Sequence, residues 1–87
     1  MSTFPSGHTQ RLIAEEVARA RAKFQSPAHL LVALMEEVGE LARACLQHGP
    51  SSVEAKIEAL QVCAVATRIF EEGDPSLDGL SAEARQP

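Results

Sequence analysis

The 87-residue chain has neither tryptophan nor tyrosine, so only Phe4, Phe24 and Phe70 are available to stack on a flat ligand such as a nucleobase. It also lacks any apolar run long enough to cross a bilayer, and its first residues do not join a basic region to an apolar one. We therefore expect a soluble protein with no membrane partner.

Basic residues are in the minority, since eight lysines and arginines stand against twelve aspartates and glutamates, for a net charge of −4. This balance argues against binding to the phosphate backbone of a nucleic acid. Cysteines are also few: Cys45 and Cys63 both fall in apolar stretches and lack the spacing of metal ligands. We expect buried free thiols and a cytoplasmic location, with a disulfide as the less favoured alternative.

Apolar residues recur every three or four positions along three segments, which is the spacing of amphipathic helices. Ser26 and Pro27 supply an N-cap and a first-turn proline for the second segment. Before the third segment, Ser51 and Glu54 have the spacing of a capping box, which favours Glu54 as a helix cap over Glu54 as a metal ligand. The sequence therefore predicts an all-α fold of three helices in up-down order, at about residues 9–24, 27–48 and 52–72.

We place these helices in one domain, residues 9–74, between a flexible lead-in (1–8) and a flexible tail (75–87). A chain this small buries only about 60% of its unfolded surface, so a lone monomer would be marginally stable. Apolar positions also nearly encircle the third predicted helix, as in helices that lie inside a bundle or an interface. We expect the units to assemble into a helical bundle, as a homodimer or homotetramer.

Three carboxylates fall within five residues of the second predicted helix, at Glu36, Glu37 and Glu40. Glu37 and Glu40 are three positions apart, so both project from one flank of the helix. Like charges this close repel one another unless a cation lies between them. Mg²⁺ is the natural candidate because it prefers oxygen ligands. The alternative is a solvated acidic flank, which is common on amphipathic helices.

The third predicted helix repeats this spacing with Glu58 and Gln61. Glu-x-x-Glu on one helix followed by Glu-x-x-Gln on the next resembles the MazG-like family of all-α nucleoside triphosphate pyrophosphohydrolases, whose signature is Glu-x-x-Glu followed by Glu-x-x-Asp. The resemblance covers about residues 29–74 and is closest in the run from Leu34 to Leu41. It departs at position 61, where Gln replaces Asp and the site loses one charge.

The resemblance implies an Mg²⁺-dependent enzyme, with Mn²⁺ as the alternative cation, that hydrolyses a nucleoside triphosphate to a monophosphate and pyrophosphate in nucleotide house-cleaning. It implies that Glu37, Glu40, Glu58 and Gln61 are metal ligands, Gln61 through a neutral carbonyl oxygen. Glu36 and Glu37 are the catalytic candidates, with Glu36 as a further ligand or as the base that orients the attacking water. The alternative function is a catalytically impaired relative that binds metal or nucleotide, or serves as a helical assembly module.

Two further residues are candidates for binding substrate phosphate. Arg68 lies on the helical stripe of Glu58 and Gln61, two turns on, where its alternative is an ion pair with Glu71, Glu72 or another subunit. His29 is expected in the first turn of the second helix, on the side of Glu36 and Glu40. The alternative there is a helix-start or core histidine.

Overall fold

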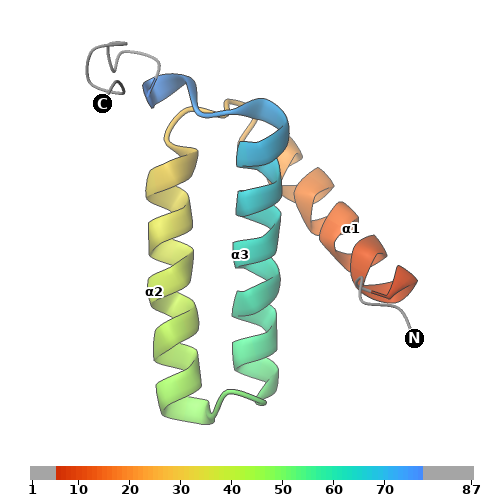
Figure 1. Cartoon of the computed structure of the whole chain (residues 1–87), viewed down its shortest axis with the longest axis vertical. Helices are drawn as coiled ribbons and strands as arrows, with labels where there is room; N and C mark the ends of the chain where they lie inside the picture. Colours follow the sequence, from red (N-terminus) through yellow and green to blue (C-terminus); the bar gives the residue numbers. More distant parts are fainter. Residues whose placement is uncertain (1–5, 78–87) are drawn as a thin grey trace, which may run out of the picture.

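A computed structural model of the chain describes residues 6–77 (Figure 1). It contains three α-helices, α1 (Gly7–Lys23), α2 (Leu30–His48) and α3 (Val53–Glu72), and a short 3-10 helix, η1 (Pro75–Leu77). The described residues contain no strand, so the predicted all-α fold of three helices is confirmed. No helix within this part of the chain is both long and apolar enough to cross a membrane.

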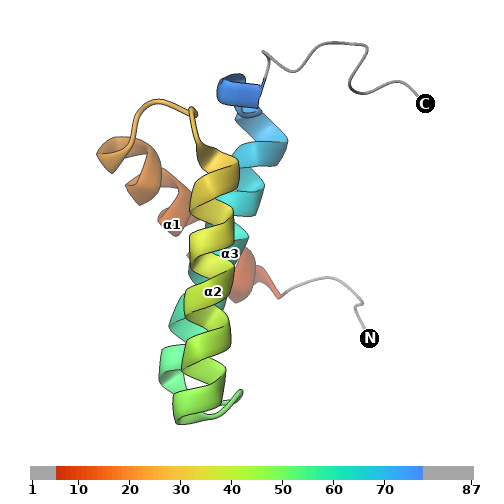
Figure 2. The same cartoon turned by 90° about the vertical axis from the view of Figure 1, so that its left-hand side faces the viewer.

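Helices α2 and α3 lie antiparallel along their whole lengths, and α1 crosses α3 obliquely (Figures 1 and 2). Within residues 6–77, no Cα atom of α1 comes within 8 Å of one in α2, so only α3 packs closely on both of the other helices. The fold is therefore a helical hairpin with a third helix attached to one arm. A pocket lies between the end of α1, the start of α2 and the middle of α3.

Helix α2 begins three residues later than the sequence predicts, because Ser26 and Pro27 do not cap it. His29 precedes the helix with a left-handed backbone, φ 67°, and its side chain makes no capping hydrogen bond. The carboxylate of Asp74 accepts the backbone N–H groups of His29 and Leu31, each at 2.9 Å. A residue beyond the end of α3 thus caps the start of α2.

The other helix ends follow local signals, with one correction. Ser52, and not Ser51, caps α3, since its hydroxyl accepts the Ala55 N–H at 3.1 Å. The predicted capping box between Ser51 and Glu54 is therefore wrong. Gly49 and Gly73 cap the C-terminal ends of α2 and α3, each with a positive φ.

Helical residues extend beyond both predicted ends of the domain. Residues 7 and 8 of the expected lead-in belong to α1, which Ser6 caps through a 3.1 Å hydrogen bond from the Thr9 N–H. Residues 75–77 of the expected tail form η1. The remaining residues of both segments, 1–5 and 78–87, lie outside the described part of the chain.

Little of the single chain is fully buried. The buried apolar residues are Val17, Leu30, Ala44, Ala55 and Ala64. Large apolar side chains face outward instead: Phe70 is 91% exposed and Leu46 is 88% exposed. Cys45 and Cys63 are free thiols as predicted, but Cys63 is exposed, which contradicts the expectation of a buried thiol. Within residues 6–77, part of the apolar surface of α2 and α3 thus stays exposed.

Candidate metal centre

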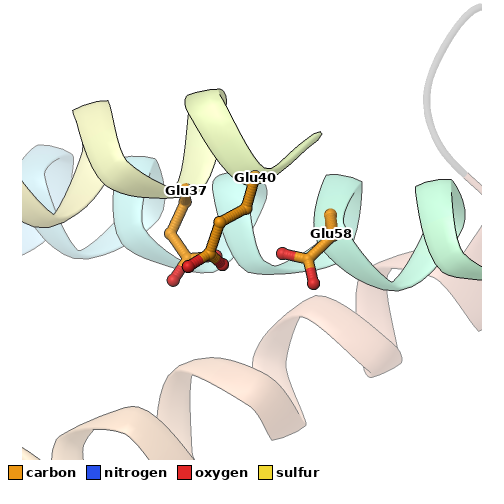
Figure 3. Close-up of side chains that lie close together, drawn as sticks. All are labelled: Glu37, Glu40 and Glu58. Atoms are coloured by element: carbon orange, nitrogen blue, oxygen red, sulfur yellow. The ribbon is translucent and has the colours of Figure 1, made fainter. Parts of the chain in front are cut away.

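Glu37 and Glu40 of α2 lie opposite Glu58 of α3, and the three side chains gather between the two helices (Figure 3). Each contributes a carboxylate oxygen within 4.8 Å of the oxygens from the other two. The pairing follows from local geometry, because Glu37 and Glu40 are one turn apart and the antiparallel hairpin brings Glu58 level with them. The structure thus brings together three of the four predicted metal ligands.

The cluster is short of hydrogen-bond donors and partly shielded from water. Glu37 and Glu58 are half-buried, and one carboxylate oxygen of each, Oε2, is buried with no hydrogen-bond partner among residues 6–77. Burial raises the pKa of Glu37, and the charges of Glu40 and Glu58 raise it further. Burial and the neighbouring Glu40 likewise raise the pKa of Glu58. Unpaired carboxylate oxygens that repel one another suit a divalent cation, which takes oxygen ligands.

The fourth predicted ligand, Gln61, is engaged elsewhere through its amide nitrogen. Gln61 Nε2 donates to Glu16 Oε1 of α1 at 2.6 Å. Glu16 is only 5% exposed, and it also accepts hydrogen bonds from Arg19 at 2.6 and 3.0 Å. A carboxylate from α1 therefore lies directly beside Gln61.

Sequence reasoning missed Glu16, although a signal for it exists. Glu16 falls among Ile13, Val17 and Ala20, the residues that form the apolar face of α1. A charged residue on an apolar face needs a buried partner, because an unpaired charge there is costly. The sequence alone does not identify that partner, which is 45 residues away at Gln61.

Arg68 is almost completely buried, with 2% of its surface exposed. Its guanidinium forms two hydrogen bonds with Glu72, from Nε to Oε2 at 2.9 Å and from Nη2 to Oε1 at 3.0 Å. Arg21 of α1 also pairs with Glu72, at 2.7 Å, and with Glu71. These cations hold the pKa of Glu72 at about 2, with Arg68 as the larger cause. The ion pair with Glu72, one of the alternatives for Arg68, is therefore present.

Pockets lie on both sides of the carboxylate cluster. The first, of about 390 Å³, opens between α1, the start of α2 and the middle of α3, and we call it the wedge pocket. It brings together predicted site residues from distant positions: Glu36, Glu37, Gln61, Arg68 and His29. His29 thus lines the same pocket as Glu36, although it precedes α2 and the prediction that it lies in the first turn is wrong. The rest of the lining is mainly apolar: Ala20, Phe24, Leu30, Val32, Ala33 and Val65.

The second pocket, of about 470 Å³, lies toward the turn that joins α2 to α3, and we call it the turn pocket. Glu40 and Glu58 form part of its lining, together with Arg43, Gln47 and His48 of α2. The carboxylate cluster therefore separates an apolar pocket from a polar one. Glu36, the predicted base, is exposed and lies on the side of the wedge pocket. Comparison of the chain with known protein families, with curated proteins and with solved structures finds no match.

Proposed function

We propose that this protein is an Mg²⁺-dependent nucleoside triphosphate pyrophosphohydrolase of MazG-like type, with Mn²⁺ as the alternative cation. The observation that carries the proposal is the convergence of Glu37, Glu40 and Glu58 from two helices, with two buried oxygens that have no hydrogen-bond partner in the described part of the chain. This arrangement fits a hard divalent cation better than it fits a solvated acidic flank, because water does not reach those oxygens. The Glu-x-x-Glu and Glu-x-x-Gln pattern supports the same function.

In this proposal Glu37, Glu40 and Glu58 hold the cation, which when bound neutralises charge on the phosphate oxygens. Gln61 remains a candidate fourth ligand through its carbonyl oxygen, since the hydrogen bond to Glu16 uses only its amide nitrogen. The wedge pocket takes the base and sugar, with Phe24 as the aromatic side chain available for stacking. Arg68 and His29 line that pocket and remain candidates for contacting the substrate.

The reaction that these residues would carry out is hydrolysis between the α- and β-phosphates. The oxygen of a water molecule forms a bond to the α-phosphorus, and the bond from that phosphorus to the bridging oxygen breaks. The bridging oxygen leaves with pyrophosphate, and the proton of the water passes to a carboxylate. Glu36 is our candidate for that base, because it is exposed at the wedge pocket next to Glu37.

We also propose that the chain assembles as a homodimer or homotetramer through an apolar face of the hairpin. This hairpin face consists of two stripes with helical spacing: Leu31, Met35, Val38, Ala42 and Leu46 on α2, and Ala59, Cys63, Ala66 and Phe70 on α3. Neither stripe contains a charged residue, and their largest side chains are strongly exposed. A second copy would cover this face and remove the apolar surface that a small chain cannot bury alone.

A second candidate function is metal or nucleotide binding without turnover, within a helical assembly. It is favoured by two observations: position 61 carries no charge, and the guanidinium of Arg68 is already matched by Glu72. The first feature removes a negative charge that would help to hold the metal ion. The second leaves less positive charge to stabilise the phosphate oxygens in a transition state.

Release of pyrophosphate from a panel of nucleoside triphosphates, with and without Mg²⁺, tests the enzymatic proposal. We expect metal-dependent release that Glu40→Gln abolishes and Glu15→Gln, a change at an exposed position on α1, leaves intact. Mg²⁺ binding without release from any triphosphate would favour the second candidate. Absence of both binding and release would overturn the proposed function.

A further inference from the structure

The turn pocket contains an arginine that is free to bind an anion. Of the arginines that line pockets, Arg21 and Arg68 are bound to glutamates, whereas Arg43 makes no hydrogen bond or ion pair with any residue of the described range 6–77. Arg43 is three positions from Glu40, a spacing at which ion pairs form readily on helices, yet the two are not paired. Its guanidinium is exposed at the pocket wall beside the carboxylate cluster.

The neighbours of Arg43 add hydrogen-bond donors on the same helix. Gln47 and His48 follow Arg43 by one turn and line the same pocket. An arginine with a planar array of donors suits phosphate oxygens, and amide and imidazole N–H groups extend the same set. The wedge pocket offers no equivalent, because its arginine is held by Glu72.

We infer that the turn pocket binds the β- and γ-phosphates of the substrate, and afterwards the pyrophosphate product, with Arg43 as the anion-binding residue. This inference rests on the proposed function and gives the substrate a direction. The base lies in the apolar wedge pocket, the phosphate that is attacked lies at the carboxylate cluster, and the leaving group lies toward the turn between α2 and α3. Arg43, and not Arg68, then carries the main contact with the leaving phosphates.

The charge of the turn pocket makes binding of an anion depend on the cation. Three carboxylates, Glu40, Glu54 and Glu58, line the pocket together with the single guanidinium of Arg43. Without Mg²⁺ the negative charges therefore outnumber the positive charge of Arg43, whereas a bound Mg²⁺ would offset two of them. Pyrophosphate should therefore bind in the presence of Mg²⁺ and bind poorly in its absence.

Isothermal titration calorimetry of the full chain with inorganic pyrophosphate, with and without Mg²⁺, tests this inference. The variant is Arg43→Gln, and the matched control is Arg11→Gln, the same change at an exposed arginine of α1 that lines no described pocket. We expect Arg43→Gln to weaken Mg²⁺-dependent pyrophosphate binding at least tenfold and Arg11→Gln to change it less than twofold. Binding of Mg²⁺ alone should be unchanged or tighter in Arg43→Gln, because a nearby positive charge is removed.

The possible failures are distinguishable. If the parent protein binds Mg²⁺ and Arg43→Gln binds pyrophosphate as tightly as the parent does, the phosphate pocket is wrong and the metal centre stands. The same holds if the parent binds Mg²⁺ but no pyrophosphate. If the parent does not bind Mg²⁺ at all, the metal centre is wrong, and the phosphate pocket that depends on it is overturned as well.

Discussion

Removing one carboxylate from the cluster should stabilise the metal-free protein while abolishing its response to Mg²⁺. Glu58→Gln is the sharpest change, because Glu58 faces both Glu37 and Glu40 across the hairpin. At a separation of about 5 Å, two unit charges repel by roughly 1 kcal/mol in water and by about 3 kcal/mol at an effective dielectric constant near 20. Since the side chains can move apart, we expect the free energy of unfolding to rise by about 1–2 kcal/mol.

Magnesium should act in the opposite direction on the parent protein. A ligand that binds only the folded state stabilises it by about 2.7 kcal/mol at a hundred times its dissociation constant. The parent should therefore gain stability in excess Mg²⁺, whereas Glu58→Gln should gain little. Urea unfolding at a fixed protein concentration, with and without Mg²⁺, measures both effects.

Glu15→Gln on α1 is the control, because it removes the same charge from an exposed position away from the cluster. It should leave both the metal-free stability and the gain in Mg²⁺ close to those of the parent. The reasoning is refuted if Glu58→Gln loses stability without metal. It is equally refuted if Mg²⁺ stabilises the parent and both variants to the same extent.

Four further predictions concern the surroundings of the cluster. Gln61→Glu should lower the metal-free free energy of unfolding by about 1–3 kcal/mol, because the new carboxylate faces the buried Glu16. Adding Glu16→Gln should restore the lost stability in urea unfolding. If the second change does not rescue the first, the contact between positions 16 and 61 is contradicted. Arg68→Ala should cost about 3 kcal/mol by breaking a buried ion pair, and a change below 1 kcal/mol would show that the pair is not buried. Phe70→Glu should reduce the mass measured by light scattering to that of a monomer, and an unchanged mass would exclude this part of the hairpin face. Metal-free stability should rise as the pH falls from 7 toward 5, because the raised pKa values of Glu37 and Glu58 make the folded protein take up protons before the unfolded chain does. Asp74, with a pKa of about 2, stays ionised over this range and keeps its cap on α2. A flat profile of stability against pH would refute this.

The parts of the structure that sequence reasoning predicts well depend on local spacing. The convergence of Glu37, Glu40 and Glu58 follows from helical periodicity and a short connection, because a two-helix hairpin with a Gly-Pro turn has few ways to align. The ends of α2 and α3 at Gly49 and Gly73 follow from the backbone freedom of glycine.

The parts that sequence reasoning misses depend on partners far along the chain. The N-cap signal at Ser26 and Pro27 is a sound local signal, but the start of α2 is set by Asp74, more than forty residues away. The hydrogen bond between Gln61 and Glu16 is missed for a similar reason, because a polar pair between two helices leaves no periodic pattern in the sequence. Local chemistry thus predicts the elements and the carboxylates, and tertiary contacts decide the helix boundary and the role of position 61.

The cap that Asp74 places on α2 has a consequence for how the molecule opens. The turn at Gly49 joins the end of α2 to the start of α3, and the hydrogen bonds of Asp74 join the end of α3 to the start of α2. The hairpin is therefore a closed loop that should unfold as one cooperative unit. Helix α1 stands outside that loop: among the helices of residues 6–77, it packs closely only on α3, and residues 24–29 connect it to α2. Amide exchange should therefore divide the protein into a slow hairpin and a faster α1. If so, fluctuations of α1 should reshape the wedge pocket, which α1 helps to line, while the three carboxylates, all carried by the hairpin, keep their mutual geometry.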